Sequence, residues 1–177
     1  MYETRNDLSQ DARLQMVKLL NARLADAIDL RTQVKVAHWN VKGPEFIALH
    51  KLFDEVAADV DEYVDLIAER AVQLGGTADG TARQVAERSS LDEYSAEGAA
   101  ERHVPAVADA LADFGKSARH AIDLAEAAGD QDTCDIFTEV SRGVDKWLWF
   151  VEAHLQAGAW SGAAAGRAGG EARHPSH

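Results

Sequence analysis

Two histidines and a carboxylate lie on either side of a predicted turn, and side chains of these types could bind a divalent metal. His38 comes six residues before Pro44 and His50 comes six residues after it, so a helical hairpin turning at Pro44 would bring both to one level. Asp54 is four residues beyond His50 and would share its helix face. Imidazole and carboxylate groups suit a divalent transition metal, and a carboxylate-rich set with open positions suits iron.

A second pair of carboxylates, Asp65 and Glu69, lies four residues apart on the same predicted helix. Asp65 follows Asp54 by eleven residues, so both pairs share a face but lie about 16 Å apart along the axis at ~1.5 Å per residue. Ligand bonds of about 2 Å cannot span that distance within one chain. An antiparallel twofold partner would set Asp65 and Glu69 of one subunit against His38, His50 and Asp54 of the other. A twofold interface would then make two equivalent sites.

The same spacing also fits a protein without a metal site. A single histidine on an apolar helix face is commonly a core residue. The acids of this helix could form a solvated surface: Asp59, Asp61, Glu62, Asp65 and Glu69. The Glu-x-x-His pattern that ferritin-like bundles use within one subunit occurs only at Glu171–His174, near the C-terminus, so an intrasubunit di-iron site of that kind is not expected.

Four long helices must position these side chains. Proline is rare, glycine is absent from long stretches, and apolar residues recur at helical spacing. The helices are predicted at residues 10–39, from Pro44 to Gly75, at 95–127, and from Asp130 or Asp132 to about residue 156. Trp147 and Phe150 are expected to pack inward.

The connection between the second and third helices is long. It is predicted to carry a short helix near Thr81–Arg88. Ser90 and Glu93 have capping-box spacing, which predicts a helix restart there, with Pro105 near the start of the third helix or at a kink in it. Two short turns and one long crossover are typical of an all-α, ferritin-like four-helix bundle. The expected organisation is a flexible segment at 1–9, the bundle at 10–157 and a flexible Gly/Ala-rich tail at 158–177.

Composition narrows the class of protein. The chain has 177 residues, of which 27% are charged and 46% hydrophobic, as in a single globular domain. No apolar run is long enough for a transmembrane helix, and no secretory signal is visible at the N-terminus. A single cysteine, Cys134, excludes an intrachain disulfide framework and a multi-cysteine zinc site. These features favour the cytosol.

Two segments resemble the mini-ferritins of the Dps family. They are AHWNVKGPEFIALHKLFDEVAADVDEYVDLIAERAVQLGGTADGT, from Ala37 to Thr81, and VDKWLWFVEAHL, at 144–155. The similarity covers residues 8–157. It implies a hollow dodecameric shell with the ferroxidase site between twofold-related subunits. The family's ligand positions match five residues: His38, His50 and Asp54 from one chain and Asp65 and Glu69 from the other.

The resemblance also implies a function. Fe(II) would be oxidised at the site, with hydrogen peroxide preferred over dioxygen, and Fe(III) stored in the cavity, which protects DNA from oxidative damage. Trp39 matches a family tryptophan near the site and could quench stray oxidising equivalents or simply pack. Family shells admit iron through acidic threefold pores, for which Asp130 and Asp135 are candidates and Glu126 a weaker one. Acids near a helix N-terminus could equally complement its dipole.

DNA binding is less well supported. Many family members bind DNA through lysine-rich N-terminal tails, whereas residues 1–13 here contain two arginines against three acids. The C-terminal tail offers Arg167 and Arg173, with two histidines that would charge at lower pH. The net charge of −12 repels phosphate at long range. Two alternatives stay open: a nucleoid protein that compacts DNA, and an assembly that holds zinc or manganese without turnover.

Overall fold

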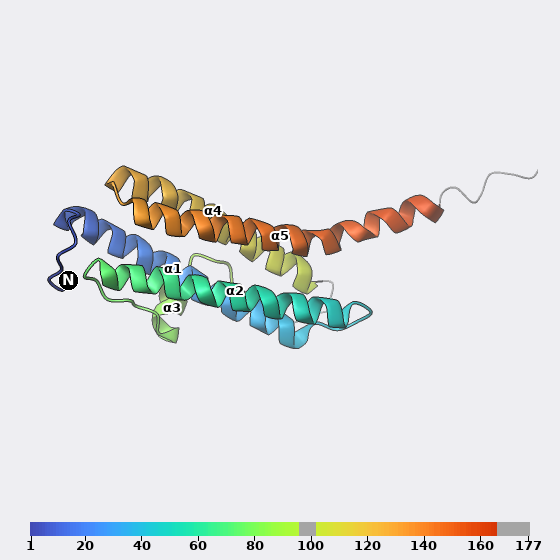
Figure 1. The fold of residues 1–177 in the computed structure, drawn as a ribbon. Helices are drawn as coiled ribbons and strands as arrows, with labels where there is room; N and C mark the ends of the chain where they lie inside the picture. Colours follow the sequence, from blue (N-terminus) through green and yellow to red (C-terminus); the bar gives the residue numbers. More distant parts are fainter. Residues whose placement is uncertain (96–101, 166–177) are drawn as a thin grey trace, which may run out of the picture.

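The computed structural model describes residues 1–95 and 102–165, with residues 157–165 given by their backbone only. In order along the chain, the helices are α1 (Gln10–Asn40), α2 (Phe46–Gln73), α3 (Ala82–Arg88), α4 (His103–Ala128) and α5 (Gln131–Ala165) (Figure 1). The described residues contain no strand. The all-α fold class is thereby confirmed.

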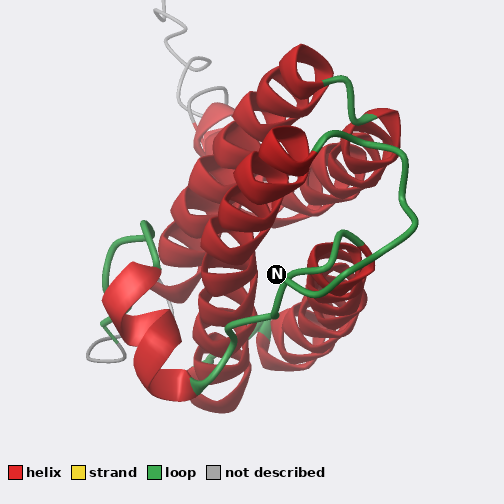
Figure 2. Ribbon diagram, turned by 90° about the vertical axis from the view of Figure 1, so that its left-hand side faces the viewer, coloured by secondary structure: helices red, strands yellow, loops and turns green. Residues whose placement is uncertain are grey.

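The four long helices form two layers. The α1–α2 hairpin packs against the α4–α5 hairpin, and α3 lies outside the bundle against α1 (Figures 1 and 2). Large apolar side chains from all four long helices fill the space between the layers, among them Leu30, Phe53, Phe114 and Phe137. The polar face of the hairpin formed by α1 and α2 is therefore left outside the core. Among the described residues, no helix is long and apolar enough to cross a membrane.

Local signals set most of the helix ends. The Ser9 hydroxyl accepts a hydrogen bond from the Ala12 N–H and caps α1. Gly43, at φ 106°, turns the chain between α1 and α2. Pro44 was expected at the first helical position, but it lies within this turn and α2 begins at Phe46. Gly129 ends α4 in the left-handed conformation, as predicted.

The crossover differs from the prediction. The capping box forms at Thr81 and Gln84, at the start of α3, and not at Ser90 and Glu93. The Ser90 N–H and hydroxyl instead donate to Asp26 Oδ1 of α1, at 2.7 and 3.1 Å. Residues 91–95 are not helical, and α4 begins only at His103, which places Pro105 in its first turn. A contact distant in sequence thus overrides the local signal for a helix.

The segments before α1 and at the end of α5 add to the bundle. The N-terminal segment contacts the end of α2, where the Tyr2 N–H donates to the Gly75 carbonyl at 2.6 Å. At the other end α5 continues to Ala165, past the predicted end near residue 156, which fits the high helix propensity of its alanines. Trp147 is buried and Phe150 packs partly against the core. The rest of the predicted tail lies outside the described residues.

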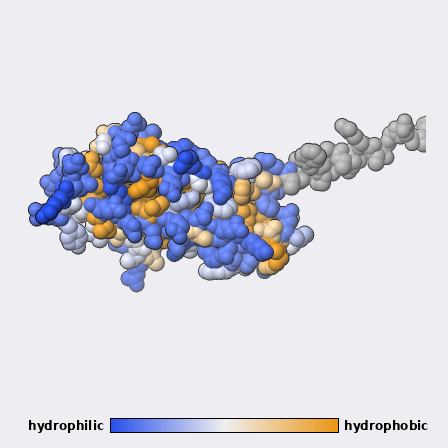
Figure 3. Space-filling view, in the orientation of Figure 1, coloured by the Kyte–Doolittle hydropathy of each residue, from blue (hydrophilic) through white to orange (hydrophobic). Residues whose placement is uncertain are grey.

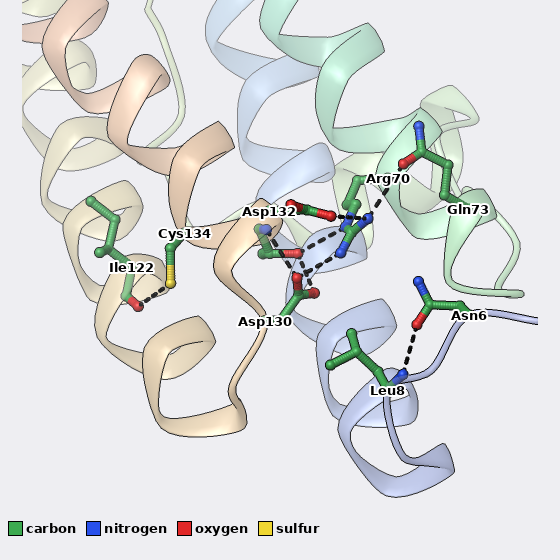
Figure 4. A network of polar contacts seen from close by, with 9 residues as sticks. Asn6, Leu8, Arg70, Gln73, Ile122, Asp130, Asp132 and Cys134 are labelled. Carbon is green, nitrogen blue, oxygen red and sulfur yellow. Dashed lines mark hydrogen bonds and ion pairs between the residues drawn. The ribbon is translucent and has the colours of Figure 1, made fainter.

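A buried ion pair joins α2 to the start of α5 (Figure 4). One guanidinium nitrogen of Arg70 lies 2.6 Å from Asp130 Oδ1, and the Arg70 Nε–H donates to the Thr133 hydroxyl at 3.2 Å. Asp130 also accepts from the backbone N–H and the hydroxyl of Thr133, so it caps α5 as predicted. The exposed Asp132 adds a longer contact of 3.3 Å to the same guanidinium. This network fixes the C-terminal half of α2 against the other hairpin.

Close packing at Gly143 gives a testable prediction for stability. A Cβ at this position of α5 would lie 1.8 Å from the Tyr63 hydroxyl oxygen of α2. Gly143→Ala is expected to lower the free energy of unfolding by about 1–3 kcal/mol, because overpacking outweighs the ~1 kcal/mol gain in helix propensity. Denaturant unfolding measures this change. The double variant Gly143→Ala/Tyr63→Phe should recover part of the loss, and a stabilised single variant would contradict the packing described here.

Candidate metal centre

His38 and His50 hold each other in place across the turn between α1 and α2. His38 Nδ1 lies 2.7 Å from the His50 carbonyl oxygen, and His50 Nδ1 lies 2.9 Å from the His38 carbonyl oxygen. The two rings are stacked, with centroids 3.7 Å apart and an interplanar angle of 22°. The prediction that the hairpin brings the two histidines to one level is confirmed.

These hydrogen bonds fix the orientation of both imidazoles and place a hydrogen on each Nδ1. A carbonyl oxygen can only accept, so each Nδ1 must carry the hydrogen. In the neutral imidazole, a hydrogen on Nδ1 places the lone pair on Nε2, and this is the form that binds a metal. A backbone carbonyl at Nδ1 is also the usual orienting partner of a metal-binding histidine. Two orientated nitrogen donors are therefore available at this end of the hairpin.

Asp54 lies next to the histidines on the outer face of α2. Its Oδ1 is 3.9 Å from His38 Nδ1 and 2.6 Å from the Lys35 ammonium of α1. The hydrogen bond and charge of Lys35 lower the pKa of Asp54 below its usual value of 3.8. Asp54 is thus an exposed carboxylate with one of its oxygens held by Lys35.

Trp39 lines the same surface. It is 67% exposed and, with Lys35 and Asp54, borders a shallow hollow of about 380 Å³ between α1 and α2. Phe46 lies on the other side of the histidines, with its ring centroid 5.0 Å from that of His50. The residues beside the paired histidines therefore include an aromatic ring at Phe46 and, at Trp39 and Asp54, the border of the hollow.

Asp65 and Glu69 lie further along the exposed face of α2. In the described part of the chain, no group of three or more His, Cys, Asp and Glu side chains converges closely enough to hold a metal ion. The structure thus places His38 against His50 with Asp54 beside them, but within the described part of one chain neither these three nor Asp65 and Glu69 converge into a metal-binding group. A site that uses all five residues must take them from two subunits.

Two contributors to this region were missed from the sequence. Lys35 lies three residues before His38 on α1, so helical spacing could have placed it on the same face. The carbonyl groups of His38 and His50 carry no sequence signal, because their role depends on the angle at which the two helices meet.

The remaining candidate residues have different surroundings. Asp130 is only 2% exposed and paired with Arg70, so its carboxylate is already engaged and is not free to line a pore. Asp135 and Glu126 are exposed and remain candidates. Arg167 and Arg173 lie outside the described residues.

The bundle and the open histidine–carboxylate face together define a ferritin-like protein, and the family model for the ferritin-like domain matches residues 17–159. A DNA protection during starvation protein of Agrobacterium fabrum is 44% identical over 156 residues, which are 88% of this chain and 96% of that protein. The chain belongs to the family of DNA protection during starvation proteins, the Dps family. The resemblance seen in the sequence is thereby confirmed.

Solved structures agree with this assignment. DpsC from Streptomyces coelicolor is 31% identical and superposes with a TM-score of 0.83, covering 86% of this chain and 90% of that one. A Dps protein from Bacillus brevis is 29% identical, with a TM-score of 0.79, and covers 83% of this chain and 99% of that one. The likeness extends over nearly the whole of both relatives.

Proposed function

We propose that this protein is a ferroxidase and iron-storage mini-ferritin, which oxidises Fe(II) at sites shared between subunits and stores Fe(III) in a dodecameric shell. The observation that carries the proposal is the reciprocal hydrogen bonding of His38 and His50, which leaves both Nε2 atoms free to bind metal. Membership of the ferritin-like family supports iron as the metal. By removing Fe(II) and its oxidant together, the protein would protect DNA from hydroxyl radicals.

The donor set suits this substrate. His38, His50 and Asp54 would hold iron from one subunit, and Asp65 and Glu69 would hold it from the partner. Imidazole nitrogens bind Fe(II) well, while carboxylate oxygens bind the harder Fe(III) product more strongly. Hydrogen peroxide accepts two electrons and each Fe(II) gives one, so two ferrous ions are oxidised for each peroxide reduced to water. Excess carboxylates also attract the incoming cations.

Protection of DNA does not require binding to it. The relatives' name refers to DNA protection, and removal of iron and peroxide would account for it. The N-terminal segment contacts Gly75 through Tyr2 and is acidic, so it differs from a free basic arm. Direct binding through Arg167 and Arg173 is the alternative. Gel-shift assays of the full chain and of a variant ending at residue 157 distinguish the two, since only tail-mediated binding disappears on truncation.

Lys35 gives a prediction about metal affinity. Its ammonium holds Asp54 and repels a nearby cation, so Lys35→Met is expected to tighten binding of Fe(II) by up to about fivefold, the range of an exposed ion pair. Anaerobic calorimetric titration with Fe(II) measures the affinity. Lys51→Met, an equal charge change at an exposed site on α2, serves as the control. Weaker binding in the Lys35 variant alone would contradict the assigned role of Asp54.

The proposal is tested by oxidation under defined conditions. The protein is loaded with Fe(II) anaerobically, substoichiometric hydrogen peroxide is added, and ferric absorbance is followed by stopped flow. Fast oxidation by the wild type and its loss in His50→Ala are expected, with circular dichroism to confirm folding. Equal rates in the two proteins would reject the site, and metal analysis that found zinc or manganese without oxidation would reject the activity.

A further inference from the structure

The outer face of α2 carries a stripe of side chains that the single chain leaves uncovered. Successive positions are three or four residues apart, which keeps them on one side of the helix. The stripe begins at Ile47, passes through the proposed ligands His50, Asp54, Asp65 and Glu69, and ends at Val72. His50 is half-buried and the others are exposed. The proposed ligands are thus bounded at each end of the helix by an apolar residue.

The two apolar ends have complementary shapes. Ile47 is 60% exposed and lies beside the α1–α2 turn, where Figure 3 shows an apolar area at the end of the bundle. Val72 is 54% exposed at the opposite end of α2. Beside Val72 is a hollow of about 380 Å³ bordered by Ala68, Glu69, Gln73 and Ala78. One end of the helix therefore projects an apolar side chain, and the other end has room for one.

The register of the shared iron site brings these two ends together. That site sets His50 against Glu69 of the partner subunit. In an antiparallel pair of helices, a step back along one helix is matched by a step forward along the other. Ile47 is three residues before His50, and Val72 is three residues after Glu69. Ile47 of each subunit therefore arrives level with Val72 of the partner subunit.

The middle of the stripe allows the required close approach. Ala58 lies on it between Asp54 and Asp65, and its small side chain lets two facing helices come near each other. Asp61 follows Ala58 on the stripe and is paired with Arg31 of its own chain. Its charge is therefore balanced when α2 of a second subunit approaches. The centre of the stripe thus contains neither a bulky residue nor an unpaired carboxylate.

We propose that Ile47 inserts beside Val72 of the partner subunit, in the hollow next to Glu69, and so sets the register of the twofold interface and closes each iron site. The inference rests on the proposed function, because the shared ligands supply the register. Apolar cover on this side excludes bulk water and strengthens the attraction between the carboxylates and the metal. Each of the two equivalent sites receives one such cover.

Disulfide cross-linking of the metal-free protein tests this contact. In a Cys134→Ser background, the pair Ile47→Cys/Val72→Cys is expected to form covalent dimers on oxidation. The two positions lie roughly 37 Å apart within one α2, so any disulfide between them joins two subunits. Each single cysteine variant, and the pair Ile47→Cys/Glu62→Cys, whose second position is exposed on α2 but lies roughly 15 Å along the helix from Val72 and outside the hollow, should stay monomeric on a non-reducing gel.

A second pair of variants tests the apolar contact itself. Ile47→Asp would place a charge in the hollow, so it is expected to raise the concentration at which the assembly dissociates at least tenfold, while Ile47→Leu leaves it unchanged. Sedimentation measures assembly, and circular dichroism should show an unchanged helix content, since Ile47 is exposed in the single chain.

The possible outcomes separate this inference from the proposed function. Cross-linked dimers in a protein that oxidises no iron would support the contact and reject the ferroxidase. Normal iron oxidation without a cross-link, or equal cross-linking by the Glu62 control pair, would overturn the contact and leave the ferroxidase standing. Unchanged assembly of Ile47→Asp would also overturn it.

Discussion

Arg70→Met is expected to lower the free energy of unfolding by about 3–5 kcal/mol, the cost of removing one partner from a buried ion pair. Asp130 would remain 2% exposed with no compensating charge, while Arg70 itself is only 5% exposed in the native chain. The methionine keeps most of the apolar volume of the arginine stem, so the change reports mainly the lost charge. Denaturant unfolding followed by circular dichroism measures the effect.

Two variants show whether the buried charge is the cause. Asp132 contacts the same guanidinium but its side chain is 80% exposed, so Asp132→Asn should cost no more than about 1 kcal/mol. In the double variant Arg70→Met/Asp130→Asn, the asparagine still caps α5 but carries no charge. The double variant should therefore regain part of the free energy of unfolding that Arg70→Met loses. Equal losses in Arg70→Met and Asp132→Asn would show that the pair is not a buried anchor.

Asp65→Ala is expected to slow the oxidation of Fe(II) by more than the ~10–100-fold that loss of an outer-shell partner costs at a metal site. The reason is that Asp65 is proposed to bind iron directly, although in the described part of its own chain it joins no group of three potential metal-binding side chains. Because Asp65 is exposed in the single chain, stability should hardly change. Initial rates of ferric absorbance after peroxide addition measure the loss.

Glu62→Ala is the matched control, since it removes another exposed carboxylate from the same helix. Its rate should stay close to that of the wild type. If Glu62→Ala and Asp65→Ala lost activity equally, a general effect of negative charge on iron attraction would explain both, and Asp65 would not be a ligand.

Much of the fold could be predicted because local signals and final contacts agree. Apolar spacing, Gly43 and Gly129 place the long helices to within a few residues at most ends. The start of α4 could not be predicted, because Ser90 bonds to Asp26, a residue of α1 that is distant in sequence. No local pattern reports such a contact.

The same distinction applies to the candidate site. That His38 and His50 lie at the same height along the α1–α2 hairpin follows from counting residues on either side of the turn. The engagement of Asp130 by Arg70 does not, because the two belong to different hairpins and meet only once the bundle has formed. The family resemblance makes Asp130 a candidate for the pore, with complementing the helix dipole as the alternative, whereas its buried ion pair is visible only in the folded chain.

The central claim is that each iron site draws its ligands from two subunits, and mixed assemblies test it most directly. His50→Ala and Asp65→Ala subunits are unfolded together, refolded as a mixture and assayed with Fe(II) and peroxide. A mixed twofold pair has one site that carries both defects and one that carries neither. Random mixing should therefore restore about one quarter of the wild-type sites. A mixture of His38→Ala and His50→Ala, whose defects lie in the same half-site, should restore none. If the first mixture stayed as inactive as its components, the five residues would not form a site shared between subunits.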